Sequence, residues 1–294
     1  MERRRGVGRS APLVAVSVIS LLGILGLIER KAFDVQERHT FVLPPDAASL
    51  MLSQGGQDKW LYKTHFAKHP LVNEGFFVEF GARNGKEHSN TYFFEHALGW
   101  SGILLEVLPS EQKEIAKNRP GSAVIDGGVC EYDGAVEILK HAFDGWGGRA
   151  DTYDRSRSLA HPTTTTVTAA CYRLDTLVKT FGVARINYMS VDTEGSELQA
   201  LRSFPWRDVL VDFVAVEVLL GTPDRKAKED ELVAFMTSVG YKVEKDYVFA
   251  DDTKDVFFRP ALPGVPRAAV DRRRFREATQ ICRLLRRCLG GGAP

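Results

Sequence analysis

The chain contains 294 residues, and 44% of them are hydrophobic, which is enough apolar material for one large domain or two small ones. Its 39 lysines and arginines nearly balance 38 acidic residues, and the resulting net charge of +1 excludes the usual electrostatic basis for nucleic-acid binding. Four cysteines in a chain of this length predict neither a disulfide scaffold nor a zinc site, and we expect no metal site.

The N-terminal segment has the composition of a membrane span. Residues 11–28 are almost wholly apolar, and 18 helical residues cover roughly 27 Å, close to the hydrocarbon thickness of a bilayer. Arginines precede the run, and no small-x-small cleavage site follows it, so an uncleaved signal anchor fits better than a cleaved signal peptide or a buried core helix. The positive-inside rule places residues 1–10 in the cytoplasm. We expect a type II membrane protein of the Golgi or endoplasmic reticulum, with the plasma membrane as the alternative.

After a mixed stem at residues 29–56, short apolar runs alternate with segments of helical spacing. The predicted strands are residues 75–81, 102–107, 122–125, 186–191 and 211–218. The predicted helices are residues 90–98, 109–118, 174–181, 197–203 and 229–239. This alternation predicts an α/β domain, residues 57–262, with a mainly parallel sheet covered on both faces. Residues 241–249 and 255–259 would form a closing hairpin, and residues 145–168 a loop or lid.

The first predicted strand leads into a glycine-containing loop with Gly81 and Gly85, and the second ends in Glu106. Glycines let a ligand approach the backbone beyond the carboxyl ends of parallel strands, and an acidic residue about 20 positions later takes ribose hydroxyls. The dinucleotide motif GxGxxG is absent because Arg83 stands at its second glycine, so a cationic nucleoside such as S-adenosylmethionine suits the pocket better than NAD. Asp126, followed by Gly127, either meets the adenine or makes an Asx turn.

A second group of acidic residues follows the fourth predicted strand. Asp192, Glu194 and Glu197 lie within six residues, and Gly195 permits a tight turn into the next helix. These carboxylates either cap the helix and face solvent or line the site. Asp192 and Glu194 fall at the ligand-facing edge, which favours the functional interpretation.

Several motifs in a fixed order resemble the FkbM-type methyltransferase family. They are Glu79-Phe80-Gly81-Ala82-x-x-Gly85, Ser89-Asn90-Thr91 with Glu95, Gly99-Trp100-x-Gly102-Ile103-Leu104-Leu105-Glu106, Asn118-Arg119, Cys171-x-x-Leu174-Asp175-Thr176-Leu177 and Ser190-Val191-Asp192-Thr193-Glu194-Gly195-Ser196-Glu197. The resemblance covers roughly residues 57–218. It implies a class I S-adenosylmethionine-dependent Rossmann-like fold, with a seven-stranded, mainly parallel sheet and an antiparallel last strand. It also implies O-methylation of a sugar or another hydroxyl-bearing substrate.

The same resemblance assigns roles by position. It implies that Glu79, Gly81 and Gly85 cradle the methionine, that Glu106 binds the ribose, and that Asp192 and Glu194 line the reaction site. The full set of residues expected at the cofactor is Glu79, Gly81, Ala82, Gly85, Glu106, Asp126 and Gly127.

Methyl transfer requires a group that removes a proton from the acceptor hydroxyl. Asp192 is the favoured base and His88 the reserve, because histidine titrates near neutrality but a lone surface histidine is common. The predicted function is therefore O-methylation of a glycan or glycoconjugate. The alternative is a membrane-anchored trafficking or binding protein that keeps the fold without turnover.

The C-terminal tail, residues 263–294, is basic, and residues 272–289 have an amphipathic pattern. This helix would lie on an anionic membrane, pack back on the domain, or stand in solvent. Cys282 and Cys288 would allow intermolecular disulfides and a homodimer in an oxidising lumen, whereas Cys130 and Cys171 have the character of core residues.

Overall fold

A computed structural model describes residues 41–141, 147–152, 164–219, 224–248, 253–262 and 272–285. Leu43–Pro294 form one compact unit. None of the helices within the described ranges is long and apolar enough to cross a membrane, and the predicted span at residues 11–28 lies outside those ranges.

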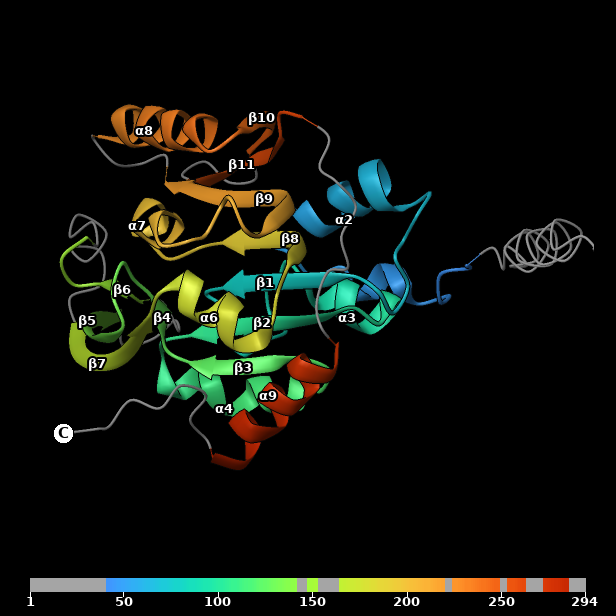
Figure 1. The fold of residues 1–294 in the computed structure, drawn as a ribbon, viewed down its shortest axis with the longest axis horizontal. Helices are drawn as coiled ribbons and strands as arrows, with labels where there is room; N and C mark the ends of the chain where they lie inside the picture. Colours follow the sequence, from blue (N-terminus) through green and yellow to red (C-terminus); the bar gives the residue numbers. More distant parts are fainter. Residues whose placement is uncertain are drawn as a thin grey trace, which may run out of the picture. The chain divides into compact units, whose positions relative to one another are not determined.

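The core of this unit is a seven-stranded sheet with the order β10-β11-β9-β8-β1-β2-β3 (Figure 1). Its strands are β1 (Phe76–Phe80), β2 (Ser101–Glu106), β3 (Ala123–Asp126), β8 (Arg185–Val191), β9 (Leu210–Leu219), β10 (Tyr241–Val248) and β11 (Thr253–Pro260). The ladders from β9 through β8, β1 and β2 to β3 are parallel, and β11 runs antiparallel to both β9 and β10. The predicted closing hairpin and the predicted class I sheet with an antiparallel last strand are thus confirmed.

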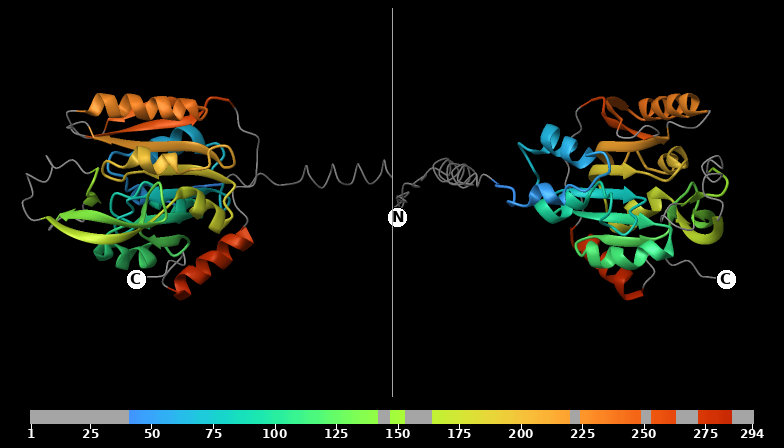
Figure 2. Two further views of the ribbon diagram at one scale, coloured as in Figure 1. Left: turned by 60° about the vertical axis from the view of Figure 1, so that its left-hand side comes forward. Right: turned by 180° about the vertical axis from the view of Figure 1, so that it is seen from behind.

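Helices cover both faces of the sheet (Figure 2). The helical elements are η1 (Ala47–Leu50), α2 (Gln57–Leu61), η2 (Tyr62–Phe66), α3 (Tyr92–Leu98), α4 (Pro109–Asn118), α6 (Leu174–Phe181), α7 (Glu197–Arg202), α8 (Arg225–Ser238) and α9 (Arg272–Leu285). Buried side chains of α6, α7, α8 and α9 belong to the apolar cluster on one face, and those of η1, α2, η2, α3 and α4 to the cluster on the other. Because both faces are covered, the parallel strands are nearly continuous apolar runs.

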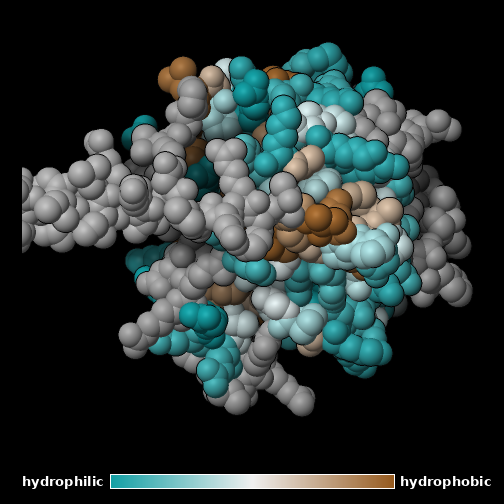
Figure 3. Space-filling view, turned by 90° about the vertical axis from the view of Figure 1, so that its right-hand side faces the viewer, coloured by the Kyte–Doolittle hydropathy of each residue, from teal (hydrophilic) through white to brown (hydrophobic). Residues whose placement is uncertain are grey.

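Successive side chains of a strand alternate between these two faces. In β1, Phe76, Val78 and Phe80 pack on the α6 side, whereas Phe77 and Glu79 face the α3 side. The carboxyl ends of β1, β8 and β9 point to the left in Figure 1. The opposite end, at the amino ends of these strands, is shown in Figure 3, where hydrophilic residues make up most of the described surface and brown residues form a small group.

A second sheet lies beyond the carboxyl ends of the main strands (Figure 1). Its order is β4-β7-β5-β6, with β4 (Gly128–Val129), β5 (Gly134–His141), β6 (Gly147–Arg149) and β7 (Thr164–Tyr172). The prediction of a loop over residues 145–168 is therefore wrong at both ends. The threonine run begins β7 instead, because β-branched residues favour a pleated strand, and β7 pairs with β5 along its length.

Cys130 and Cys171 form a disulfide, with their Cα atoms 5.6 Å apart. Both are buried, as expected of core residues, but the prediction did not include their pairing. The bond fastens the segment after β4 to β7. Cys282 and Cys288 lie where no side chain is described.

The compact unit includes residues that lie outside the predicted domain at both ends. The compact unit begins at Leu43, and Ala47, placed in the stem by the sequence, is buried in the core. In the tail, Phe275 of α9 is buried, with its ring 5.1 Å from that of Phe76 and 5.9 Å from that of Phe181. Of the alternatives for the amphipathic tail, the structure supports packing on the domain, because an aromatic ring gains more by burial than by solvation.

Candidate active site

A cleft opens at the carboxyl ends of the main strands, between them and the second sheet. Its wall includes residues from the ends of β1, β2, β8, β9 and β11, together with residues of β5 and β6. In an open parallel sheet, ligands bind outside the carboxyl ends of the strands. The location therefore agrees with the pocket predicted from the sequence.

The loop after β1 passes very close to the loop after β8. Gly81 has φ +69°, and a Cβ atom at this position would lie 2.3 Å from the carbonyl oxygen of Asp192. A side chain is excluded both by this contact and by the left-handed backbone. Gly81 thus brings the two loops together at the cleft, and both residues line it.

Glu106 ends β2 and is 4% exposed in the wall of the cleft. Its carboxylate accepts hydrogen bonds from the backbone N–H groups of Arg83, at 2.7 Å, and Leu108, at 2.8 Å. Burial raises the pKa of Glu106 to about 7, although these hydrogen bonds oppose the change. The carboxylate keeps lone pairs for further donors, and its role at the ribose stays a prediction.

Glu79 reaches the cleft wall, but its carboxylate is held by the protein itself. Its Oε1 accepts the N–H of Asn90 at 2.7 Å, and its Oε2 accepts the hydroxyls of Ser89 at 2.9 Å and Thr91 at 2.5 Å. Arg119 Nη1 lies 3.4 Å from the same Oε2. Glu79 therefore organises the loop before α3, and its role in cradling methionine stays a prediction.

Arg119 is the centre of this buried network. It is fully buried, and its Nε donates to Glu95 Oε2 at 2.8 Å while Nη2 donates to the Thr91 hydroxyl at 2.8 Å. Glu95 also accepts the N–H of Gly121 and the hydroxyl of Ser122. The network joins β1, α3 and the end of α4. We call Arg119, Glu79 and Glu95 the arginine cluster.

Three of the residues predicted at the cofactor do not line the cleft. Gly85 packs under Arg119 and Ile115, where a Cβ atom would approach the two side chains to 2.9 and 3.2 Å. Ala82 is buried, and Asp126 is exposed at the surface. Gly127 does line the cleft. Gly85 and Ala82 belong to the predicted loop, so the spacing of the loop residues did not show which of them lie away from the cleft.

Asp192, Glu194 and Glu217 form a second group of carboxyl groups, with one oxygen from each lying within 4.8 Å of the others. The first two follow β8, as predicted, whereas Glu217 belongs to β9 and was missed. Burial raises the pKa of Glu217 well above its usual range, and the charges of Asp192 and Glu194 raise it further. Its one sequence signal was an acidic residue inside the apolar run VDFVAVEV.

Asp255 is a further buried carboxyl group in the cleft wall that the sequence did not reveal. It is 5% exposed and stands directly opposite Glu217 in the β9–β11 ladder. Burial raises its pKa to about 7, against a hydrogen bond from Gln57 that lowers it. Directly opposite residues of an antiparallel pair share one face. We call Asp192, Glu194, Glu217 and Asp255 the acidic cluster.

Glu197, the third carboxylate of the predicted motif, folds back onto its own loop. Its Oε1 accepts the N–H groups of Thr193, at 3.1 Å, and Gly195, at 2.9 Å. It fixes the loop that carries Asp192 and Glu194. Glu194 itself has φ +55°, a backbone conformation uncommon outside glycine that is often found at functional sites.

His88, the reserve base, is exposed and lines the cleft. Its Nδ1 lies 3.3 Å from Arg83 Nη1, and Arg83 also lies 3.7 Å from Glu87. His88 and Arg83 both have positive φ angles, 60° and 47°. The loop after β1 therefore carries a polar rim over the cleft.

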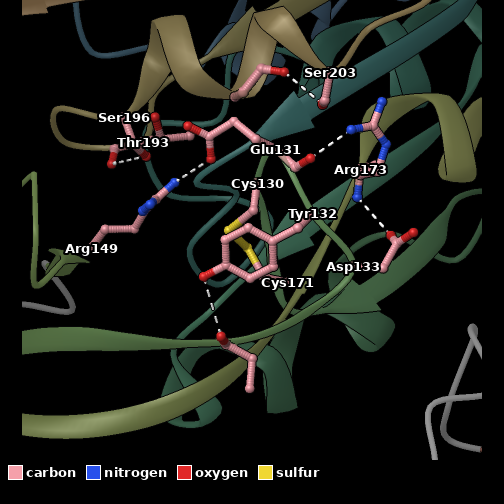
Figure 4. The surroundings of a disulfide bond; sticks show 12 residues. Cys130, Glu131, Tyr132, Asp133, Arg149, Cys171, Arg173, Thr193, Ser196 and Ser203 are labelled. Atoms are coloured by element: carbon pink, nitrogen blue, oxygen red, sulfur yellow. Dashed lines mark hydrogen bonds and ion pairs between the residues drawn. A yellow bond between two sulfur atoms is a disulfide. The ribbon is translucent and has the colours of Figure 1, made fainter.

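The second sheet forms the apolar wall of the cleft with Val136 and Ile138 of β5. Arg149 of β6 also lines it, but its guanidinium group is held by Asp151, at 2.8 and 3.0 Å, and Glu131, at 2.9 Å. Figure 4 shows Glu131 and Arg149 beside the disulfide. Arg149 thus secures the second sheet.

The solved structures that this chain resembles have low sequence identity to it. A putative rRNA methylase from Clostridium thermocellum is 11% identical, with a TM-score of 0.40, and the match covers 72% of this chain and 98% of that one. A TehB-like methyltransferase from Corynebacterium glutamicum is 7% identical, with a TM-score of 0.36 and coverages of 82% and 99%. Aeropyrum pernix fibrillarin, which carries natively bound S-adenosylmethionine, is 11% identical, with a TM-score of 0.39 and coverages of 64% and 68%.

A search of curated proteins gives no match. The model of the methyltransferase FkbM domain matches residues 79–243, which is more than half of the chain and runs from the end of β1 into β10. This chain therefore belongs to the FkbM family of S-adenosylmethionine-dependent methyltransferases.

Proposed function

We propose that the protein transfers the methyl group of S-adenosylmethionine to a hydroxyl group of a glycan or glycoconjugate. The observation that supports this proposal is the pairing, across Gly81, of a buried carboxyl group for the ribose with an acidic cluster for the acceptor. Glu106 lies on one side of Gly81 and Asp192 on the other, and all three line the same cleft.

The residues of the cleft suit the cofactor. Glu106 is buried and accepts hydrogen bonds from the backbone N–H groups of Arg83 and Leu108, and its remaining lone pairs can accept ribose hydroxyls. The apolar wall of Val136 and Ile138 offers a surface for an adenine ring. Carboxyl groups around the cleft complement a cationic sulfonium. When bound, S-adenosylmethionine supplies an electrophilic methyl group on that positive sulfur.

The chain's own groups would orient the acceptor and remove its proton. Asp192 lies at the end of β8, on the loop that Glu197 fixes. A carboxylate here can accept a hydrogen bond from the acceptor hydroxyl and take its proton as the oxygen approaches the methyl carbon to about 3–3.5 Å. His88 also lines the cleft and is the reserve base.

The compartment is part of the same proposal. The apolar run at residues 11–28 and the arginines before it support a type II anchor with the domain in the lumen of the Golgi or endoplasmic reticulum. The disulfide between Cys130 and Cys171 agrees with an oxidising compartment. Glycans are abundant there, which is why we choose them as the acceptor.

Transfer of a labelled methyl group to fractionated cell glycans, measured with the full chain purified in detergent, tests the activity. We expect Asp192→Asn to lower the rate by about 10²- to 10⁴-fold. Asp208→Asn makes the same change at an exposed turn before β9 and should have no effect. Full activity in both Asp192→Asn and His88→Ala would remove both residues as the base. Binding of S-adenosylmethionine without any turnover would favour a trafficking or binding role.

A further inference from the structure

The acidic cluster has the chemistry of a cation site. Three of its carboxyl groups place one oxygen each within 4.8 Å of the others, and they come from two neighbouring parallel strands. Acidic groups alone are common on protein surfaces and do not make a site. The neighbouring strand β11 provides independent evidence.

That evidence is a pair of buried oxygens that have no hydrogen-bond partner. Asp255 Oδ2 and Glu217 Oε2 are both inaccessible to solvent and without a partner among the described residues. Asp255 is 5% exposed, lines the cleft and stands opposite Glu217 on the same face of the sheet. Burying a hydrogen-bond acceptor without a donor costs free energy. Two such oxygens on neighbouring strands therefore indicate a ligand that presents positive charge to them.

Two positive side chains of the described cleft wall, Arg149 and Arg83, have charged or imidazole neighbours of their own. Arg149 is held by Asp151 and Glu131, and Arg83 lies beside Glu87 and His88. A cation in the cleft would complete the oxygens of Glu217 and Asp255 that have no donor among the described residues.

We propose that Asp192, Glu194 and Glu217 bind a divalent cation of the Mg²⁺ or Mn²⁺ type, beside Asp255 on the neighbouring strand. Hard cations of this class prefer carboxylate oxygens and water. In an octahedral shell with bonds of about 2.1 Å, ligands lie roughly 3 Å apart when adjacent and about 4.2 Å apart when opposite. The three oxygens all lie within 4.8 Å of one another, so side-chain movement can bring them into this geometry.

This inference rests on the proposed methyl transfer and specifies how the acceptor is activated. The three carboxyl groups leave positions open on the cation, at the edge of the cleft where the acceptor would lie. A hydroxyl held there loses its proton more easily, as water does on a bound metal ion. Its O–H bond breaks and the proton passes to water. The new O–CH₃ bond forms as the S–CH₃ bond breaks, leaving S-adenosylhomocysteine. Asp192 would then act as a ligand and not as the base.

Titration of the full chain with Mn²⁺, followed by the electron paramagnetic resonance of the free ion, tests the site without any methyl donor. We expect one Mn²⁺ per chain with a Kd below about 10⁻³ M, displaced by Mg²⁺. Glu217→Gln and Glu194→Gln should each weaken this binding by about 10-fold or more. The matched control is Glu231→Gln on α8, an exposed residue paired with Arg202, and it should bind like the unmodified chain.

Two results would overturn the site: no stoichiometric Mn²⁺ at millimolar concentration, or unchanged binding in both folded cluster variants. Glu194 is on a loop, so its variant remains informative if Glu217→Gln does not fold. Full methyl transfer in EDTA would also overturn the site while leaving the proposed function intact. Mn²⁺ binding by a chain that does not bind S-adenosylmethionine would instead overturn the function and leave the site.

Discussion

The arginine cluster and the acidic cluster lie at the same end of the same sheet, on one face of it, but they differ in how their carboxyl groups are neutralised. Glu79 and Glu95 share the fully buried Arg119. Glu217 and Asp255 face each other across two strands and keep one oxygen each without a partner in the described structure. A carboxylate paired inside the protein supports the fold, whereas one held without a donor is available to a ligand.

The largest expected effect comes from removing the positive charge of the arginine cluster. Arg119→Met should lower the free energy of unfolding by about 3–5 kcal/mol, because it leaves two buried carboxylates without their cation. Chemical denaturation measures this loss. Arg173→Met is the control, since Arg173 pairs with Asp175 at 2.8 Å but is 39% exposed, and it should cost about 1 kcal/mol or less. Equal losses in the two variants would mean that Arg119 is not a structural centre.

The difference between local and long-range contacts explains which parts of the fold and of the site could be predicted from the sequence. The parallel strands were predicted because each is a continuous apolar run, and the loops after β1 and β8 because their glycines and acids follow those runs directly. Both clusters depend on partners far apart in the sequence. Arg119 was part of a motif with no predicted role, and Asp255 meets Glu217 only through the register of β9 and β11.

The second sheet was missed for a local reason. Its strands β5 and β7 are interleaved with polar residues, and β7 begins in a run of threonines that also suits a loop. The pairing of β5 with β7 stabilises the strand conformation of both segments. The periodicity within either segment does not predict it. The disulfide was hidden in the same way, because Cys130 and Cys171 are 41 positions apart and meet only once β4 and β7 pair.

The next largest effect is the pH dependence of stability that arises from Asp255 in the acidic cluster. The pKa of Asp255 is about 7 in the folded protein and about 3.8 in an unfolded chain, so the folded state holds a proton that the unfolded state releases between these values. The contribution of Asp255 to the free energy of unfolding is therefore largest below about pH 4. It falls as the pH rises from about 4 through 7, by up to about 4 kcal/mol, and stays low at higher pH. Asp255→Asn should flatten the profile. Thermal unfolding from pH 4.5 to 8.5 measures it, and an unchanged slope would mean that Asp255 is solvated.

Gly81 stands between the two clusters and provides a smaller effect. Gly81→Ala places a methyl group 2.3 Å from the Asp192 carbonyl, so the loops must separate. Gly240→Ala is the matched control, because Gly240 also has a positive φ, +92°, but nothing within 4 Å of its added Cβ. Both variants should lose about 1 kcal/mol to backbone strain, and Gly81→Ala about 1–3 kcal/mol more. Equal unfolding midpoints would contradict the close contact between the loops.

The smallest effect concerns Glu106, which belongs to neither cluster and combines features of both. It is buried and lacks a cationic partner in the described structure, yet two backbone N–H groups keep it oriented. Its pKa of about 7 means that it is largely protonated at pH 6 and ionised at pH 8. An ionised carboxylate accepts ribose hydroxyls more strongly than a protonated one, so affinity for S-adenosylmethionine should rise about tenfold over this interval. Calorimetric titration measures the change. Glu106→Gln should bind weakly and equally at both pH values, and Glu114→Gln, an exposed control on α4, should retain the rise. A flat profile in the unmodified chain would show that the ribose hydroxyls do not bind at this carboxylate.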